Sequence, residues 1–384
     1  MKTKQIYFYV LLSTLLMLCL GIVYSYSLFR LFIESSFNIN KTQSGLPFMV
    51  VLLFYAISMA ISGILFEKHS PTIIVIIGII FITIGFIGSS FSHSIYMITI
   101  FYGIFIGIGI GILYTLPLKL IAQFNHPKIG FLTGITLLGF GLSPLVFAPI
   151  IEKLLFSYGL TQTFLILGIS YFILLISLSL PLLKKLEPLK EQTQSISHIL
   201  KQKTFYEIYI LFFLATFIGL TSIGLASSIG VELLHIKTKN IALLLGLFSI
   251  FNGLGRPIFG YINDHLNFKT SVFISFISLI IATSLLYLFY RETIIYVITF
   301  SIIFFNFGGW LSLAPSATLK AFGKQHYSKA YGLMFTAYGL GAFIGNGISS
   351  FLIDTFSFQA IYMLLCILSM IGLSIILIQK GRSQ

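Results

Sequence analysis

The sequence predicts an all-α membrane protein, with twelve transmembrane helices arranged as two six-helix repeats. Only 9% of its 384 residues are charged and 57% are hydrophobic, whereas soluble domains carry about 25% charged residues. The 33 glycines and 40 phenylalanines are typical of packed transmembrane helices. Continuous apolar runs of about twenty residues exclude a β-barrel, whose strands alternate apolar and polar residues over about ten.

Twelve apolar segments are each long enough to cross a hydrocarbon core of about 30 Å. A polar stretch that contains Pro188 separates the first six segments from the last six. We therefore expect an N-terminal bundle at residues 1–183, a cytoplasmic linker at 184–204 and a C-terminal bundle at 205–384. The segments are 6–33, 45–66, 72–91, 95–122, 129–151, 160–183, 205–232, 241–263, 269–289, 292–319, 327–353 and 357–379.

The first segment follows Lys2 and Lys4 and superficially resembles a signal peptide. Its apolar run is too long for one, and no small-residue cleavage site interrupts it. Further along the chain, several segments contain prolines that can kink a helix as access alternates. These prolines are Pro117, Pro144, Pro149, Pro257 and Pro315.

The distribution of lysine and arginine predicts that both termini are cytoplasmic. With the N-terminus inside, fifteen of these residues fall in cytoplasmic segments and five fall outside, which is a positive-inside bias. We expect a multi-pass protein of the cell membrane, embedded in the lipid bilayer. The net charge of +13 does not indicate nucleic-acid binding, because the basic residues are scattered and form no stripe.

The two halves of the sequence match each other at an offset of about 198 residues. Three matches in the same order indicate a duplicated six-helix unit with a site between the repeats. The matching pairs are residues 134–141 with 332–339, Gly111 and Pro117 with Gly309 and Pro315, and residues 63–67 with 260–264.

Arg256 carries the functional prediction. It lies about 10 Å inside segment eight, where an arginine costs at least about 2.5–3.5 kcal/mol. Its planar fork suits both oxygens of a carboxylate, and the alternative is a structural contact with carbonyl groups of a neighbouring helix. Asn252 lies one turn away on the same face. There it either contacts the substrate or makes a helix–helix hydrogen bond.

A loop motif, Gly63…Glu67-Lys68, and a weaker copy at Gly260…Asp264 resemble the Gly-x-x-x-Asp-Arg/Lys motif of the major facilitator superfamily. The resemblance covers the whole chain and implies alternating access around a central site. In that superfamily the motif lies on the cytoplasmic side, and its carboxylate can pair across helix ends and latch that face. We therefore expect these five residues to act in gating.

Finer motifs resemble the oxalate/formate antiporter and monocarboxylate transporter branch. They are Tyr24-Ser25-Tyr26-Ser27-Leu28-Phe29, Asn252-Gly253-Leu254-Gly255-Arg256 and residues 331–339. Two positions depart from the branch. Tyr338 stands where oxalate carriers place a lysine, and Asn252 stands where animal monocarboxylate transporters place an aspartate. The segment-one lysine of the latter falls near Arg30.

Arg30 has two interpretations. Near the outer end of segment one it either reaches the membrane surface or pairs with Glu34 at i+4. Alternatively it faces the cavity, where two arginines from opposite halves would hold an anion between them.

Six aromatic residues occupy helix positions that the fold places around the cavity. We expect them to form an amphipathic wall, and the alternative is ordinary core or lipid-facing packing. They are Tyr24, Tyr26, Tyr114, Phe140, Trp310 and Tyr338.

These observations together predict a monomeric secondary transporter of small organic anions, with monocarboxylates such as lactate, formate and pyruvate favoured. No Asp, Glu or His falls at mid-membrane, which favours anion exchange, or a proton moving with a weak acid, over a buried carboxylate relay. The alternatives are a dicarboxylate exchanger of the oxalate type and a non-transporting sensor. An enzyme, a cofactor and a bound metal are not expected, since no catalytic motif is present.

Overall fold

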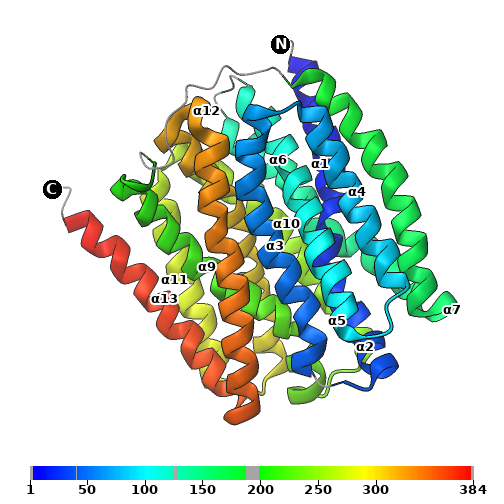
Figure 1. Cartoon of the computed structure of the whole chain (residues 1–384). Coiled ribbons are helices and arrows are strands. Elements are labelled where there is room, and N and C mark those ends of the chain that lie inside the picture. Colours follow the sequence, from blue (N-terminus) through cyan, green and yellow to red (C-terminus); the bar gives the residue numbers. More distant parts are fainter. Residues whose placement is uncertain (1–2, 40, 125, 127, 187–198, 382–384) are drawn as a thin grey trace.

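The computed structural model describes residues 3–39, 41–124, 126, 128–186 and 199–381. Within these ranges every regular element is a helix and no strand occurs, so the predicted all-α class is confirmed. The elements are α1 (Thr3–Leu20), η1 (Gly21–Ser25), α2 (Tyr26–Phe37), α3 (Lys41–Lys68), α4 (Pro71–Ser90), α5 (Ile95–Ile98), η2 (Thr99–Ile106), α6 (Gly107–Gln123), α7 (Ile129–Lys185), α9 (Lys203–Ser228), η3 (Ile229–Leu233), α10 (Thr238–His265), α11 (Phe268–Leu288), α12 (Thr293–Thr355) and α13 (Phe358–Gly381) (Figure 1).

Two of these helices contain a sharp turn and cross the bundle twice. Eleven helices in the described ranges are long and apolar enough to span a membrane, and the longest, Ile129–Leu183, has 55 residues. That length is about 80 Å, more than twice a hydrocarbon core. α7 turns at Gly159 (φ 73°) and α12 at Gly323 (φ 72°), a left-handed conformation that glycine adopts without strain. With α7 divided at its turn, the twelve predicted crossings are confirmed.

Three crossings contain irregular helix: the π-helical η2 (Thr99–Ile106) lies in the fourth, and the other two lie beside the cavity described below. The first changes from α1 to the 3₁₀ turn η1 and then to α2, and the crossing that begins with α9 ends in the π-helical turn η3. Gly21 in η1 packs directly on α7, because a Cβ there would lie 2.3 Å from the Phe140 carbonyl oxygen. Such interruptions redirect side chains within a crossing.

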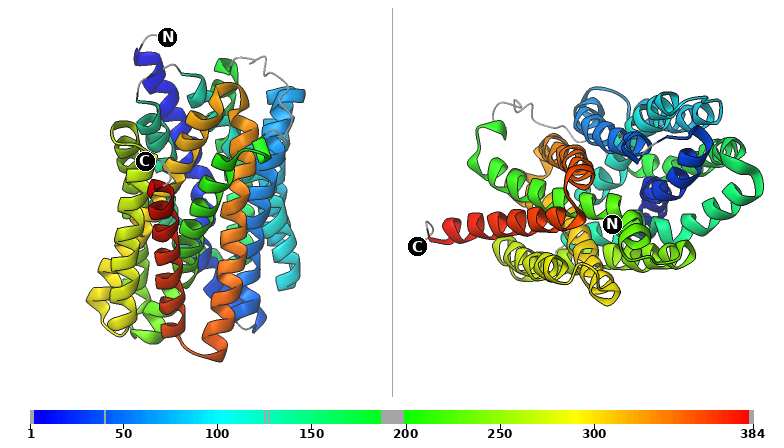
Figure 2. Two further views of the ribbon diagram at one scale, coloured as in Figure 1. Left: turned by 90° about the vertical axis from the view of Figure 1, so that its left-hand side faces the viewer. Right: turned by 90° about the horizontal axis from the view of Figure 1, so that it is seen from below.

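The two halves of the chain lie on opposite sides of the bundle and meet along two pairs of helices. The main contacts between halves join α10 to α7 and α12 to α3. Seen along the bundle, the blue-to-cyan helices and the yellow-to-red helices face each other (Figure 2). Most of the predicted linker, residues 187–198, lies outside the described residues, so the predicted domain boundaries stay a prediction.

We call the end of the bundle where α1 begins the terminal side and the opposite end the far side. α10 ends on the terminal side, and α13 runs back toward it (Figure 1). The charge distribution predicts that the terminal side is cytoplasmic.

Candidate functional site

A cavity lies between the two halves and opens toward the far side. Its volume is about 1300 Å³, counted with its opening to solvent. Its deep end is lined by Tyr24, Gly141 and Asn252, and its outer end by Arg30 and Glu232. Each crossing that lines the cavity contributes residues from its middle outward, away from the terminal side, so the structure is open on the far side.

The terminal side is closed by direct backbone contact between α7 and α10. A Cβ on Gly260 would lie 2.5 Å from the Gly130 carbonyl oxygen, and a Cβ on Gly134 would lie 2.6 Å from the Arg256 carbonyl oxygen. Glycines at these positions let the two helices approach more closely than any other residue would. The contact seals the cavity from the terminal side.

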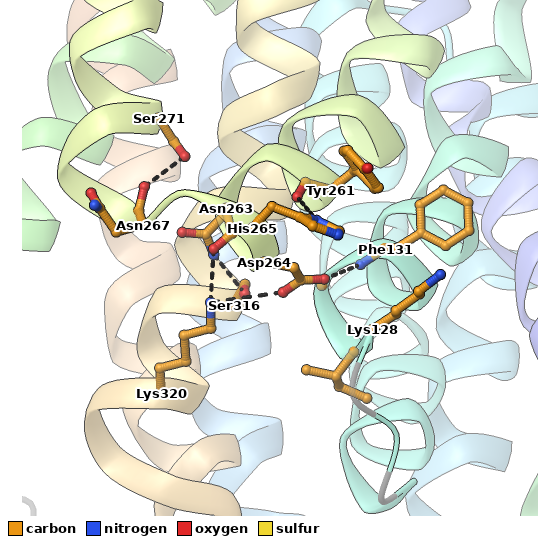
Figure 3. A network of polar contacts seen from close by, with 12 residues as sticks. Lys128, Phe131, Tyr261, Asn263, Asp264, His265, Asn267, Ser271, Ser316 and Lys320 are labelled. Atoms are coloured by element: carbon orange, nitrogen blue, oxygen red, sulfur yellow. Dashed lines mark hydrogen bonds and ion pairs between the residues drawn. The ribbon is translucent and has the colours of Figure 1, made fainter.

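A polar network around Asp264 reinforces this closure (Figure 3). The Phe131 backbone N–H, in the first turn of α7, donates to Asp264 Oδ2 at 3.0 Å, and Lys320 Nζ lies 3.7 Å from Asp264 Oδ1. Lys320 also donates to the Asn263 carbonyl oxygen at 3.0 Å. Asp264 is only 7% exposed, and its charge faces the positive end of a helix from the other half. The carboxylate therefore ties the halves together.

The remaining predicted gating residues occupy similar positions on the terminal side. Gly63 is buried near the end of α3, and Lys68 is exposed at that end. The side chain of Glu67 lies outside the described residues. Gly260 is at the α7–α10 contact already described.

Arg256 is fully buried and does not itself line the cavity; it lies behind the deep end of the cavity, against Gly141 and Asn252. Its Nη1 donates to the Leu137 carbonyl oxygen of α7 at 2.5 Å, and its Nη2 donates to Asn252 Oδ1 at 3.1 Å. The Nε has no hydrogen-bond partner, and none of the ion pairs among the described residues involves Arg256. A buried guanidinium with an unused donor and no counter-charge is costly.

Gly141 separates this guanidinium from the open space. A Cβ on Gly141 would lie 3.0 Å from Arg256 Nε and 2.7 Å from Asn252 Oδ1. Both Gly141 and Asn252 line the cavity. Arg256 Nε therefore lies directly behind Gly141, a residue of the cavity wall that has no side chain to cover it.

A compact aromatic cluster packs beside Arg256 and joins the two halves. Tyr24 and Tyr338 share a hydrogen bond of 2.9 Å between their hydroxyl groups. Phe140 packs edge-on against Tyr24 and against Tyr114, with ring centroids 5.0 Å and 5.5 Å away. Phe140 also stacks under Arg256, whose Cζ is 5.6 Å from the ring centre. Four of the predicted aromatics thus pack together: Tyr24 lines the cavity, whereas Tyr114, Phe140 and Tyr338 lie behind its wall.

The other predicted site residues lie outside this aromatic cluster. Tyr26 lines the cavity, and its hydroxyl donates to the Ser44 carbonyl oxygen at 2.6 Å. Arg30 is at the mouth, 20% exposed, where its Nε donates to Glu34 Oε1 at 3.0 Å. It is therefore apart from Arg256 and already pairs with a carboxylate.

Trp310 does not line the cavity. Its Nε1 donates to Ser275 Oγ of α11 at 2.9 Å, and its ring packs against Phe276 and Phe212. Gly308, two residues before Trp310, explains this direction. A Cβ on Gly308 would lie 1.9 Å from the Asn252 carbonyl oxygen, so the glycine faces α10 and Trp310 faces away from it.

Sequence reasoning missed several residues of the site. Tyr55 packs against Phe140 and Tyr338, and Phe335 stacks on Tyr338. One signal was present for Tyr55: the offset of 197 that relates Gly63 to Gly260 places it opposite Asn252. Phe335 is one of 40 phenylalanines, and its position is set only by the tertiary packing of α12.

Comparisons with known proteins agree on one family. A profile described as Major Facilitator Superfamily matches residues 10–321 and 241–383. The chain is 25% identical over 331 residues to an uncharacterized transporter of this type, YhjX, from Escherichia coli strain K12, covering 84% of this chain and 82% of the relative. It is 22% identical over 378 residues to the oxalate:formate antiporter of Oxalobacter formigenes, covering 96% and 90%.

A vertebrate protein and a solved structure extend this similarity. The chain is 22% identical over 363 residues to monocarboxylate transporter 12-B of Danio rerio, covering 84% of this chain and 76% of the relative. Its fold matches that of the proton:xylose symporter XylE, solved with 6-bromo-6-deoxy-D-glucose, with a TM-score of 0.75. The two share 15% identity and cover 97% and 95% of each other, which indicates a common fold.

Proposed function

The chain belongs to the major facilitator superfamily, and from that premise we propose that it carries small monocarboxylates across the membrane by alternating access. The family assignment made from the loop and helix motifs is confirmed. In the proposal, Arg256 anchors the carboxylate and Asn252 orients the guanidinium. Tyr24, Tyr338 and their aromatic neighbours form the floor beneath the substrate.

The observation that carries the proposal is the incomplete hydrogen bonding of Arg256. Its charge is buried without a carboxylate partner among the described residues, and its Nε has no acceptor. A carboxylate entering past Gly141 would accept from Nε and supply the missing negative charge. Most buried polar side-chain atoms have a hydrogen-bond partner, so the unpaired Nε favours a ligand over a purely structural role.

Binding at Arg256 also suggests how the substrate drives the conformational change. The bond from Arg256 Nη1 to the Leu137 carbonyl oxygen joins α10 to α7, which belong to opposite halves. A carboxylate that takes over this donor would remove one bond between the halves and neutralise the charge that the cavity must bury. The loaded carrier would then reorient more readily than the empty one.

A single carboxylate fits the cavity better than two. Arg30, the other arginine of the cavity, already bonds to Glu34, so it offers a second carboxylate less net attraction than a lone arginine would. Tyr338 is a neutral donor and is already bonded to Tyr24. Among the relatives, one is named for oxalate and formate and another for monocarboxylates, and the charge balance favours the monocarboxylate alternative.

The proposal is tested by uptake of labelled lactate, formate and oxalate into proteoliposomes. Each anion is supplied with and without an internal anion, and with and without a pH gradient. We expect uptake of at least one monocarboxylate to exceed that of oxalate. Dependence on internal anion would identify exchange, and dependence on the pH gradient would identify proton symport. Preferential uptake of oxalate would replace the proposal with dicarboxylate exchange.

A further inference from the structure

A second carboxamide lines the cavity, nearer its mouth, and no role has been assigned to it so far. Asn346 of α12 is 7% exposed and borders the open space. Its Nδ2 donates to the Ala342 carbonyl oxygen at 2.8 Å, one turn earlier in the helix. Among the described residues its Oδ1 accepts no hydrogen bond. The amide therefore presents an unused acceptor, with one remaining N–H beside it.

The Asn346 Oδ1 packs against Gly224 of α9, in the space that a side chain at position 224 would fill. A Cβ on Gly224 would lie 2.2 Å from Asn346 Oδ1, closer than any real contact. Gly224 also lines the cavity. Only glycine at this position lets the carboxamide point between α9 and α12 without displacement. The pair thus forms a small polar recess in a cavity wall that also contains the apolar Ile223, Leu245 and Phe304 and the polar Ser228 and Ser249.

The chemistry of the recess selects the group that fits it. A hydroxyl donates to Oδ1 and accepts from the remaining N–H, so it satisfies both. A carboxylate oxygen has no proton to donate and is repelled by Oδ1. A methyl group leaves the buried acceptor unpaired, which is unfavourable. The recess therefore suits a neutral hydroxyl and not a second acidic group.

The position of the recess sets where that hydroxyl lies on the substrate. Asn346 follows Tyr338 by eight residues, which is about 12 Å along the helix, and Tyr338 bonds to Tyr24 at the deep end of the cavity. A two- or three-carbon acid held at Arg256 would not reach Asn346. A longer chain would, with its carbons along the apolar wall between them.

We propose that Asn346 and Gly224 form a specificity subsite for a distal hydroxyl group, so that the preferred substrates are hydroxylated monocarboxylates with an apolar chain. This inference rests on the proposed function, since the carboxylate end binds at Arg256. It specifies the chemical group at the end of the substrate opposite the carboxylate, which Arg256 does not contact.

The test compares binding of hexanoate, 6-hydroxyhexanoate and adipate to the purified protein by isothermal titration calorimetry. In the unmodified protein the hydroxyl should improve affinity roughly two- to tenfold, the effect of one net hydrogen bond, and the second carboxylate of adipate should give no gain. Asn346→Leu and Gly224→Ala should each abolish the advantage of the hydroxyl. Gly246→Ala is the matched control, because the nearest atom to its added Cβ is 3.9 Å away.

An equal affinity for hexanoate and 6-hydroxyhexanoate in the unmodified protein would overturn the subsite, as would an advantage that survives in Gly224→Ala and Asn346→Leu. Either result would leave Arg256 as the anchor. Binding of hexanoate that is unchanged in Arg256→Ala would instead overturn the proposed function, and this inference with it.

Discussion

Two charged residues of α10, eight positions apart, have opposite surroundings. Both oxygens of Asp264 have partners, from the backbone of α7 and from Lys320 of α12. Arg256 has no acceptor at its Nε and no counter-charge among the described residues. A satisfied charge stabilises the conformation in which it is found, whereas an unsatisfied one favours a ligand that completes it. From this difference we propose a gating role for Asp264 and a substrate-binding role for Arg256.

The largest effect on uptake is expected from removing the charge of Arg256. Arg256→Ala should reduce uptake of the transported monocarboxylate by about 100-fold, since truncating one partner of a buried charge pair costs about 2–5 kcal/mol. Arg256→Lys should recover only part of the loss, because an ammonium cannot bind both carboxylate oxygens as the fork does. Initial uptake rates in proteoliposomes measure both variants.

Arg291→Ala is the control for this substitution, because Arg291 is exposed beside Tyr290 and lies outside the cavity. Its uptake should match that of the unmodified protein. Unchanged uptake in Arg256→Ala would contradict a substrate-binding role for Arg256 and so remove its functional distinction from Asp264.

A shift of conformation, with binding preserved, is expected from removing the satisfied charge. Asp264→Ala leaves the first turn of α7 without its acceptor, which costs about 0.5–2 kcal/mol for a helix N-terminus. The terminal side should therefore open in a larger fraction of molecules, by roughly tenfold in the equilibrium constant. Distances between spin labels on the terminal ends of α7 and α10 measure the change, with Cys19 and Cys366 replaced beforehand.

Asp264→Asn sharpens this test because its side-chain oxygen can still accept from Phe131. We expect it to fall between the unmodified protein and Asp264→Ala. Identical distance distributions in all three proteins would show that the carboxylate does not hold the terminal side closed.

A smaller loss of substrate affinity is expected from Gly141→Ala, which narrows the path to Arg256. Gly141→Ala adds a Cβ that would lie 2.7 Å from Asn252 Oδ1 and 2.9 Å from the Gly253 Cα. Relief requires Asn252 and α10 to move, so the affinity for the substrate should fall by about tenfold. Binding measured by calorimetry tests this, with Gly246→Ala as the variant that adds a methyl group at a roomier position of the cavity wall. Full affinity in Gly141→Ala would place the entry to Arg256 elsewhere.

The smallest effect on uptake is expected from removing the hydrogen bond between two neutral tyrosines, which joins the two halves. Tyr338→Phe removes the 2.9 Å bond to the Tyr24 hydroxyl and keeps the stacking on Phe335. One such bond contributes about 1 kcal/mol, so the uptake rate should change by no more than about fivefold. A change as large as that of Arg256→Ala would show that the tyrosine pair binds the substrate directly.

Sequence reasoning found the features that hydropathy and charge reveal. The twelve crossings follow from the length of the apolar segments, and Arg256 was identified because a charge deep in such a segment is rare. The 3₁₀ and π turns could not be predicted, because η1 and η3 retain the apolar character of the crossings that contain them.

The direction in which an individual residue faces also could not be predicted from the sequence. Gly141 and Gly224 are two of 33 glycines, and their roles depend on which helix they face. Trp310 shows the same limit, since Gly308 faces α10 and turns the indole toward Ser275. These positions are set by tertiary packing, which no short sequence pattern contains.

The most direct test of the account measures the affinity for labelled lactate in Arg256→Ala and Asp264→Ala side by side. The account predicts that binding weakens by at least about 30-fold in Arg256→Ala and stays within about fivefold of the unmodified protein in Asp264→Ala. Retained affinity in Arg256→Ala, or an equal loss in both variants, would contradict it.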